Sequence, residues 1–511
     1  MASRVLGVVR EQVLAAYFGA GNAMDAFNVA FRIPNLVRDL FAEGAMSAAF
    51  VPTFTRRLTH DGKESAWRLG NHVINALVVI TGVLVIFGIV FARPLVTAFA
   101  GDYADVPGKL DLTVFLTRIM LPFLTLVALA AAFMGMLNSL HRFFIPALSP
   151  AMFNVGTIVC TVALVPLMPR WRLPAIAAVA IGTVVGGLLQ AATQWPALRR
   201  EGFRYGPELD FRDEGLQRVL VLMGPGTIGL AATQVNVFVN TVLATGAGTG
   251  AVSWLNYAFR LMYLPIGLFG VSIATATVPA VSRHAAQDDR GGIRRTIADA
   301  LSLMLMLNVP ATVGLIALSV PIIRLIFERR AFTAVDTAST AAALQFYAIG
   351  LVGYSVVRIA SPTFYALNES RTPVKVSIAS VLVNAALNIA LVRVMGYRGL
   401  ALGTSIAALV NAAALMILLR RRLDGLEERR VATAFLKITL ASAAMGAAAI
   451  AVERYSWLWI GGVGLMPQMI RLAIAIGVAV AVLAASAHLL HIDEFRRGVA
   501  LVTSRIGRRR S

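Results

Sequence analysis

Four arginines lie in stretches of the chain that are otherwise apolar enough to cross a membrane. They are Arg4, Arg10, Arg38 and Arg260. An arginine at the centre of a bilayer costs about 3 kcal/mol on insertion scales, so it persists where it faces a protein interior or a water-filled cavity. The guanidinium group stays charged at physiological pH and offers a planar fork of N–H donors that matches phosphate or carboxylate oxygens. Four such groups on three hydrophobic segments predict a positively charged cavity that holds an anionic or phosphorylated substrate.

Further charged residues accompany these arginines in the first two hydrophobic segments. Those to which we assign supporting or gating roles are Glu11, Asp25, Arg32 and Glu43. At about 100° per residue, Asp25, Arg32 and Asp39 share one face of a helix. A network of ion pairs that holds the first two segments together is therefore an alternative to an anion site. Arginines outnumber the acids, and Arg260 has no acidic residue within two helical turns, which favours substrate binding.

The composition is that of a polytopic, all-α membrane protein. Of 511 residues, 58% are hydrophobic and 14% are charged, whereas soluble domains carry about 45–50% apolar and about 25% charged residues. The single cysteine, Cys160, cannot form an intramolecular disulfide. No catalytic constellation, metal-ligand spacing or nucleotide-binding loop occurs, so we expect a protein that is not an enzyme and uses no metal or cofactor.

About fourteen membrane-spanning helices are expected from the apolar runs. Their approximate ranges are 2–19, 24–52, 70–99, 111–139, 146–168, 173–196, 217–244, 251–281, 297–327, 338–366, 374–394, 398–420, 431–452 and 466–490. Several exceed the roughly 20 residues needed to cross the hydrocarbon, so tilted helices or extensions beyond the bilayer are expected.

The basic residues fall mainly in alternate loops. The net charge of +20 would favour nucleic-acid binding in a soluble protein, but here it predicts membrane orientation and no nucleic-acid partner. The loops that follow the second, fourth and each later even-numbered span are arginine-rich, and those that follow odd-numbered spans are acidic or sparse in charge. Both termini are therefore expected in the cytoplasm, in agreement with an even number of spans. The basic tail, 491–511, is expected to contact anionic membrane lipids, with docking of a protein partner as the alternative.

The two halves of the chain contain similar short sequences at a nearly constant spacing. Phe18-Gly19-Ala20-Gly21 recurs as Thr245-Gly246-Ala247-Gly248, Ala30-Phe31-Arg32 as Ala258-Phe259-Arg260, and Val51-Pro52 as Val278-Pro279. A repeat with an even number of spans predicts two lobes related by a pseudo-two-fold axis along the membrane normal. The expected parts are an N-terminal six-helix lobe at 1–205, a C-terminal six-helix lobe at 216–422, two additional helices at 431–490 and the tail at 491–511.

A set of motifs covers nearly the whole chain. The motifs are Ser3-Arg4-Val5-Leu6-Gly7, Arg10-Glu11, Phe18-Gly19-Ala20-Gly21, Asp25-Ala26-Phe27, Ile33-Pro34-Asn35-Leu36, Phe41-Ala42-Glu43-Gly44-Ala45, Trp254, Tyr257, Arg260-Leu261, Pro265, Phe364-Tyr365-Ala366 and Arg371-Thr372-Pro373-Val374. The set resembles the MviN/MurJ family, the lipid II flippases of bacterial peptidoglycan synthesis.

The resemblance implies a fold, a substrate and a location. The fold is that of the multidrug/oligosaccharidyl-lipid/polysaccharide exporter superfamily, with two six-helix lobes plus two helices. The activity is the transfer of lipid II, which is undecaprenyl-diphosphate-linked GlcNAc–MurNAc-pentapeptide, to the periplasmic leaflet of the bacterial inner membrane. The family's cavity arginines match Arg4, Arg10, Arg38 and Arg260, and its acid in the second segment matches Asp25. We also expect a monomer, with cell-wall synthesis proteins as further partners.

Three features depart from the family pattern. Where some members bind sodium through aspartates, this chain has Asn240 and Asn388, and a neutral amide is a poorer sodium ligand, so membrane potential is the expected energy source. Phe259 stands where some relatives have an acid beside the arginine of the eighth helix. The family usually has about ten more residues before the Ser-Arg motif, so the native start is expected upstream of Met1.

Three other functions compete with a lipid II flippase at this stage. A related exporter would move another polyprenyl-linked glycan or a drug, although a site for cationic drugs should be lined by acids rather than by arginines. A membrane scaffold for cell-wall enzymes would use the basic tail and tolerate reversal of the cavity charges. A scramblase would move lipid-linked substrate without any gradient.

Overall fold

The structure is a computed structural model that describes residues 2–39, 46–462 and 464–495. Every regular element in these residues is helical, and no β-strand occurs among them. A membrane-spanning backbone must satisfy its own hydrogen bonds, and a helix does so within one segment, so the long apolar runs fold in this way. The expectation of an all-α protein is confirmed.

Ten helical stretches in the described ranges are long and apolar enough to cross a membrane. They are Gly62–Val90, Lys109–Ser139, Phe144–Leu164, Ala177–Arg200, Arg290–Ala317, Ala334–Ala366, Arg371–Met395, Tyr397–Leu423, Glu428–Trp459 and Leu465–Leu489. They establish a multi-pass architecture, whereas the count of fourteen spans stays a prediction.

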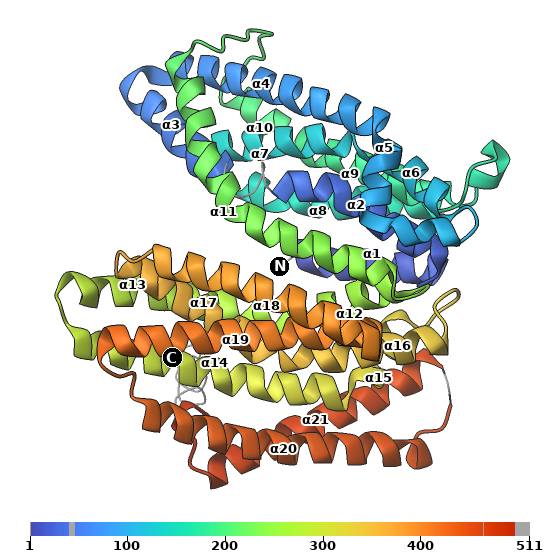
Figure 1. Ribbon diagram of the computed structural model, residues 1–511, viewed down its shortest axis with the longest axis vertical. Helices are drawn as coiled ribbons and strands as arrows, with labels where there is room; N and C mark the ends of the chain where they lie inside the picture. Colours follow the sequence, from blue (N-terminus) through green and yellow to red (C-terminus); the bar gives the residue numbers. More distant parts are fainter. Residues whose placement is uncertain (1, 40–45, 463, 496–511) are drawn as a thin grey trace, which may run out of the picture. The chain divides into compact units, whose positions relative to one another are not determined.

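The chain divides into two compact units, each visible as a bundle in Figure 1. The first unit contains residues 1–253 together with the short segment Arg329–Thr333, and the second contains Trp254–Glu328 and Ala334–Ser511. The short segment joins the first unit through the Ala331 amide, which donates a hydrogen bond to the Ala16 carbonyl oxygen at 3.2 Å. The lobe boundaries expected from the sequence repeat stay a prediction.

The first unit contains eleven α-helices and the first residues of a twelfth. The eleven are α1 (Ala2–Phe18), α2 (Asn22–Arg38), α3 (Met46–His60), α4 (Gly62–Val90), α5 (Ala92–Ala100), α6 (Lys109–Met120), α7 (Phe123–Ser139), α8 (Phe144–Leu164), α9 (Ala177–Ala192), α10 (Trp195–Arg200) and α11 (Glu214–Thr245). A 3₁₀ turn, η2 (Gly101–Asp105), connects α5 to α6. The helix α2 packs on α6, and α1 packs on α8.

The second unit holds the remaining helices. They are α12 (Ala251–Pro265), α13 (Val271–Ala286), α14 (Arg290–Ala317), α15 (Ser319–Phe327), α16 (Ala334–Ile349), α17 (Leu351–Ala366), α18 (Arg371–Met395), α19 (Tyr397–Leu423), α20 (Glu428–Trp459) and α21 (Leu465–Leu489). The last two pack against each other and, through α20, against α14 (Figure 1).

Small residues allow two helix pairs to approach closely. A Cβ atom added at Gly156 of α8 would lie 2.8 Å from the Gly186 Cα of α9, and one added at Gly353 of α17 would lie 2.7 Å from the Ala408 carbonyl carbon of α19. Membrane helices associate through such close contacts because lipid provides no hydrophobic force between them. Contacts of this kind hold α8 against α9 in the first unit and α17 against α19 in the second.

A change of helix type follows the proline of α12. Pro265 is the last residue of α12, and the next five residues, Ile266–Gly270, form a π-helical turn before α13 begins. Proline removes a backbone donor, and π turns occur frequently at functional sites. This irregular turn lies immediately after the part of α12 that carries Arg260.

Candidate functional site

The four arginines are divided between the two units. Arg4 and Arg10 lie on α1 and Arg38 is the last residue of α2, all in the first unit, whereas Arg260 lies on α12 in the second. Arg4 and Arg260 are exposed, and Arg38 is half-buried. The association of these four residues into one site stays a prediction.

Arg10 is the most enclosed of the four arginines. Its Nη2 atom lies 2.7 Å from Oε1 of its neighbour Glu11, and both residues are buried. The guanidinium carbon also lies 5.3 Å from the centroid of the Phe153 ring on α8. An arginine stacked on an aromatic face is held in a defined orientation. Glu11 neutralises part of the charge of Arg10, and its supporting role at a substrate site stays a prediction.

Arg38 has the same kind of arrangement at the end of α2. Its Nη2 atom lies 2.7 Å from Oδ1 of Asp39, the next residue. Each of these two ion pairs joins residues that are adjacent in the chain. Pairs of this kind do not join α1 to α2, so the alternative of an ion-pair network that holds the first two segments together stays a prediction. Arg32 is half-buried on α2, and Glu43 lies outside the described residues.

A buried charge cluster that the sequence did not predict surrounds Asp25. The Asp25 side chain is 0% exposed and that of Lys109, at the start of α6, is 2% exposed. Their Nζ and Oδ2 atoms lie 3.0 Å apart. The Lys109 ammonium also lies 4.0 Å from the centroid of the Tyr103 ring on η2. Burial, and after it the negative charge of Asp25, raises the pKa of the Tyr103 hydroxyl above its usual range.

Asp25 also accepts hydrogen bonds from the first turn of α12. Oδ2 accepts from the Gly250 amide at 2.7 Å, and Oδ1 accepts from the Ser253 amide at 3.1 Å and the Ser253 hydroxyl at 2.7 Å. The first amides of a helix have no partner within it and carry a partial positive charge, so a carboxylate there is stabilised. Asp25 of α2 therefore caps α12 from a position 225 residues earlier in the chain.

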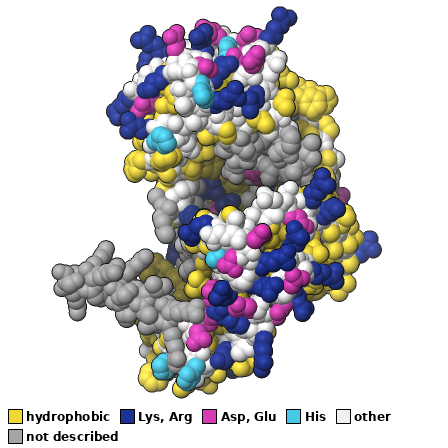
Figure 2. Space-filling view, turned by 90° about the vertical axis from the view of Figure 1, so that its left-hand side faces the viewer, with side chains coloured by type: hydrophobic (Ala, Val, Ile, Leu, Met, Phe, Trp, Pro, Cys, Tyr) yellow, Lys and Arg dark blue, Asp and Glu magenta, His cyan; other side chains and the backbone are white. Residues whose placement is uncertain are grey.

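Ion pairs join distant segments at the helix ends and connecting loops of the first unit. Glu201 accepts from Arg142 Nε at 2.7 Å and lies 3.6 Å from Lys63 Nζ, and Arg57 pairs with Asp213 at 2.8 Å. The hydrogen bond from Arg142 holds the pKa of Glu201 below its usual value. Figure 2 shows lysine and arginine side chains gathered on one face of each unit, with acidic side chains among them.

Arginine outside the predicted cluster also occurs within apolar helices. Arg471 of α21 is 5% exposed, donates to the carbonyl oxygens of Ile460 and Gly462, and lies 3.6 Å from the centroid of the Trp457 ring. These contacts close the turn between α20 and α21, so the role of Arg471 is structural. In the sequence, Arg471 could have been recognised as a single arginine near the start of an apolar run.

The two asparagines noted as departures from the family pattern lie on different helices. Asn388 of α18 is buried and its Nδ2 atom donates to Asn384 Oδ1 at 3.1 Å. Asn240 lies on α11, in the other unit. Over the described part of the chain, no group of three or more histidine, cysteine or acidic residues could hold a metal ion.

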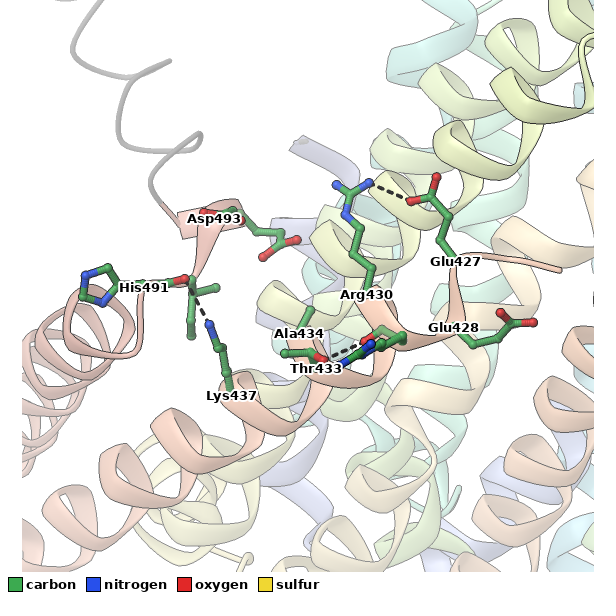
Figure 3. A pocket seen from close by; sticks show the side chains of 11 residues that line it. Glu427, Glu428, Arg430, Thr433, Ala434, Lys437, His491 and Asp493 are labelled. Atoms are coloured by element: carbon green, nitrogen blue, oxygen red, sulfur yellow. Dashed lines mark hydrogen bonds and ion pairs between the residues drawn. The ribbon is translucent and has the colours of Figure 1, made fainter.

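A pocket of about 540 Å³ lies at the start of α20 (Figure 3). It is lined by Glu427, Glu428, Arg429, Arg430, Thr433, Ala434, Lys437, His491, Ile492, Asp493 and Glu494. Arg430 is held by Glu427 at 3.0 Å, and Lys437 Nζ donates to the His491 carbonyl oxygen at 3.5 Å. Charges of both signs therefore face this pocket where the chain leaves α21.

The arrangement of helices is that of a known class of membrane transporter. An inward-facing structure of a multidrug resistance MATE family transporter of the MOP superfamily matches with a TM-score of 0.68 at 17% identity, covering 83% of this chain and 96% of that one. At this level of identity the likeness shows the fold alone. The protein has the fold of MOP-superfamily transporters.

Comparisons over the full sequence define the family. The family model described as "Lipid II flippase MurJ" matches residues 14–471, so the chain belongs to the MurJ family. It is 34% identical to a probable lipid II flippase MurJ of Bdellovibrio bacteriovorus, over 97% of this chain and 94% of the relative. It is 35% identical to the lipid II flippase MurJ of Burkholderia cenocepacia, over 82% and 81% of the two chains.

A solved MurJ structure supports the same assignment. A lipid II flippase MurJ in an inward closed conformation matches with a TM-score of 0.78 and 28% identity, covering 96% of this chain and 97% of that one. The family and the ten apolar helices make this a multi-pass protein of the bacterial inner membrane. The resemblance inferred from the motifs is confirmed.

Proposed function

We propose that this protein moves lipid II from the cytoplasmic to the periplasmic leaflet for peptidoglycan synthesis, by alternating access. The observation that carries the proposal is the family match over residues 14–471. Lipid II presents a diphosphate, two sugars and a peptide, all too polar for the hydrocarbon. A protein that carries them across must offer charged and polar groups inside the membrane, and the arginines of α1, α2 and α12 would supply them here.

The proposed substrate site consists of the four arginines. Arg4, Arg10, Arg38 and Arg260 would bind the diphosphate, because guanidinium forks match phosphate oxygens and hydrogen bonds between charged partners are about twice as strong as neutral ones. Supporting this, Arg10 is held in place by Glu11 and Phe153 before any ligand arrives. Arg260, on the unit that lacks the other three, would complete a clamp formed from both lobes.

Asp25 is proposed as a gating residue. Its carboxylate accepts donors from α6 and from the first turn of α12, so it joins elements that begin in opposite halves of the repeat. Alternating access requires contacts that form in one state and break in the other. Hydrogen bonds to Gly250 and Ser253 are well suited to this, since water can replace them when the cavity opens on that side.

The finer architecture is proposed from the sequence pattern. Fourteen spans, two six-helix lobes with a two-fold relationship, and both termini in the cytoplasm account for the alternation of basic and acidic loops. Lys437 and the basic tail, 491–511, would contact anionic membrane lipids where the chain leaves α21 (Figure 3). We propose a monomer that works beside cell-wall synthesis proteins.

The energy source is tested by separating membrane potential from sodium. Moving a negative charge out of a negative interior is downhill by about 2.3 kcal/mol per charge per 100 mV, so the potential can drive export of an anionic headgroup. In vesicles with purified protein and lipid II, we expect the rate of translocation to fall when an ionophore collapses the potential. Replacing sodium by potassium at constant potential should leave the rate unchanged, since Asn388 provides an amide rather than a carboxylate.

The opposite pattern would overturn this part of the proposal. A rate that requires sodium and ignores the potential would assign coupling to a sodium site. A translocation rate that depends on neither sodium nor the membrane potential would indicate a scramblase. Vesicles without protein give the background rate in each condition.

A further inference from the structure

Arg358 is a further arginine within an apolar helix, and neither the motifs nor the repeat assigns it a role. It lies on α17 among Val356, Val357, Ile359 and Ala360 and is half-buried. The helix belongs to the apolar stretch Ala334–Ala366, which is long enough to cross a membrane. Its charge therefore lies within a segment where an arginine is costly.

The recorded partner of Arg358 is an aromatic residue rather than an acid. Its Nη2 atom donates a hydrogen bond to the Tyr263 hydroxyl, and its guanidinium carbon lies 5.6 Å from the centroid of the same ring. Within the described residues, no carboxylate lies within ion-pairing distance of Arg358. A tyrosine hydroxyl supplies a dipole but no negative charge, so the positive charge of Arg358 stays uncompensated in the absence of a ligand.

Tyr263 places Arg358 beside the proposed substrate face of α12. Arg260 and Tyr263 are three residues apart on one helix, and side chains at this spacing are neighbours with Cβ atoms about 5–6 Å apart. Both are exposed, Tyr263 by 39%. Arg358 contacts Tyr263 from α17, so it reaches the helix that carries Arg260 three residues away from that arginine.

An aromatic cluster holds this arrangement in place. Phe259 lies 5.7 Å from Tyr263 between ring centroids, 5.4 Å from Tyr347 and 6.4 Å from Tyr354, with the last two rings nearly perpendicular to it. Edge-to-face contacts of this kind restrict ring positions. Phe259 thus orients Tyr263, and Tyr263 in turn orients Arg358, before a ligand arrives.

We propose that Arg358, oriented by Tyr263, binds a carboxylate of the peptide stem of lipid II. A single guanidinium matches a single carboxylate in charge and can bind both its oxygens, whereas a diphosphate carries more charge than one arginine neutralises. One edge of the guanidinium is occupied by Tyr263, which leaves other N–H donors for the ligand. The inference rests on the proposed function and adds a second anionic subsite, specific for the peptide rather than the diphosphate.

The test compares two forms of the substrate. One is lipid II with free peptide carboxylates, and the other is lipid II in which these carboxylates are converted to carboxamides. Binding of each to the purified full-length protein is measured by native mass spectrometry. A hydrogen bond to a charged group contributes about 1.5–3 kcal/mol, so the intact protein should prefer the free acid by about 10-fold to 100-fold.

Arg358→Gln should remove this preference and leave affinity for the carboxamide form unchanged. Tyr263→Phe, which keeps the ring and loses the hydroxyl, should reduce the preference. Arg393→Gln is the matched control, because Arg393 is an exposed arginine near the end of α18, and it should keep the full preference.

Three outcomes would contradict the proposal. Equal binding of both forms by the intact protein excludes a carboxylate subsite while preserving lipid II as substrate. Equal weakening of both forms by Arg358→Gln assigns Arg358 to the diphosphate or to folding, and the melting temperature separates these two. Failure of the intact protein to bind either form would overturn the proposed function together with this inference.

Discussion

Replacement of Arg260 by alanine is expected to abolish growth of a strain that depends on this protein for its flippase. The side chain is exposed on α12, which is followed directly by the π-helical turn Ile266–Gly270. Its loss would remove the contribution of the second unit to diphosphate binding, about 1.5–3 kcal/mol per charged hydrogen bond. The measurement is complementation in a flippase-depleted strain, with the amount of membrane-inserted protein determined by immunoblotting.

Two companion variants make the Arg260 result specific. Arg260→Lys keeps the charge but loses the planar fork, so we expect weak growth rather than full growth. Arg393→Ala removes an exposed arginine elsewhere in the second unit and should grow normally. Full growth of Arg260→Ala at a normal protein level would exclude Arg260 from the mechanism.

Disruption of the buried Asp25–Lys109 pair is expected to have the largest effect on stability. Lys109→Met leaves the Asp25 carboxylate buried without its ammonium partner, and breaking a buried ion pair in this way costs about 3–5 kcal/mol. The hydrogen bonds that Gly250 and Ser253 donate to Asp25 remain in this variant. We therefore expect the loss of unfolding free energy to lie toward the lower end of this range. Thermal unfolding in detergent should show a clear fall in melting temperature.

A double variant separates the ion pair from other effects of the two substitutions. Asp25→Asn combined with Lys109→Met removes both charges, so the combined loss should be smaller than the sum of the single losses. Lys63→Met is the control, since Lys63 is exposed and an exposed ion pair contributes little. Strictly additive losses would show that Asp25 and Lys109 do not stabilise each other.

The helices were predictable from the sequence because their signal is local. An apolar run long enough to cross a bilayer has to satisfy its own backbone hydrogen bonds, so the stretches around α4, α14 and α21 could be predicted as helical without any tertiary information. The change from α-helix to a π-helical turn after Pro265 could not be predicted from the sequence. Proline and glycine indicated a bend there but not its form.

The sequence was sufficient to identify the arginines within apolar segments, but not the residues with which the charged side chains form ion pairs. Arg10 and Arg38 pair with the residue next to them, and a rule based on helix faces does not anticipate contacts between neighbours. The partners of Asp25 are 84 and 225 or more residues away, so only the fold brings them together. Lys109 was expected in a loop, because it stands just before the apolar run that follows it.

The contact between Arg358 and Tyr263 could not be predicted from the sequence. Arg358 was visible as an arginine in an apolar run, but no acid, motif or repeat marked it. The structure adds Tyr263, which belongs to another helix and has a polar hydroxyl next to the guanidinium. The fold therefore turns an isolated charge into part of a surface that includes Arg260.

The most direct test of the central claim is the leaflet in which lipid II is found. In spheroplasts of a flippase-depleted strain, an enzyme added outside cleaves the lipid II that has reached the periplasmic leaflet, and the cleaved fraction is measured. We predict that this protein restores the cleaved fraction, and that the variant carrying Arg10→Gln, Arg38→Gln and Arg260→Gln, present in the membrane at an equal level, leaves it at the depleted value. An equal cleaved fraction with the intact protein and the triple variant would contradict the account.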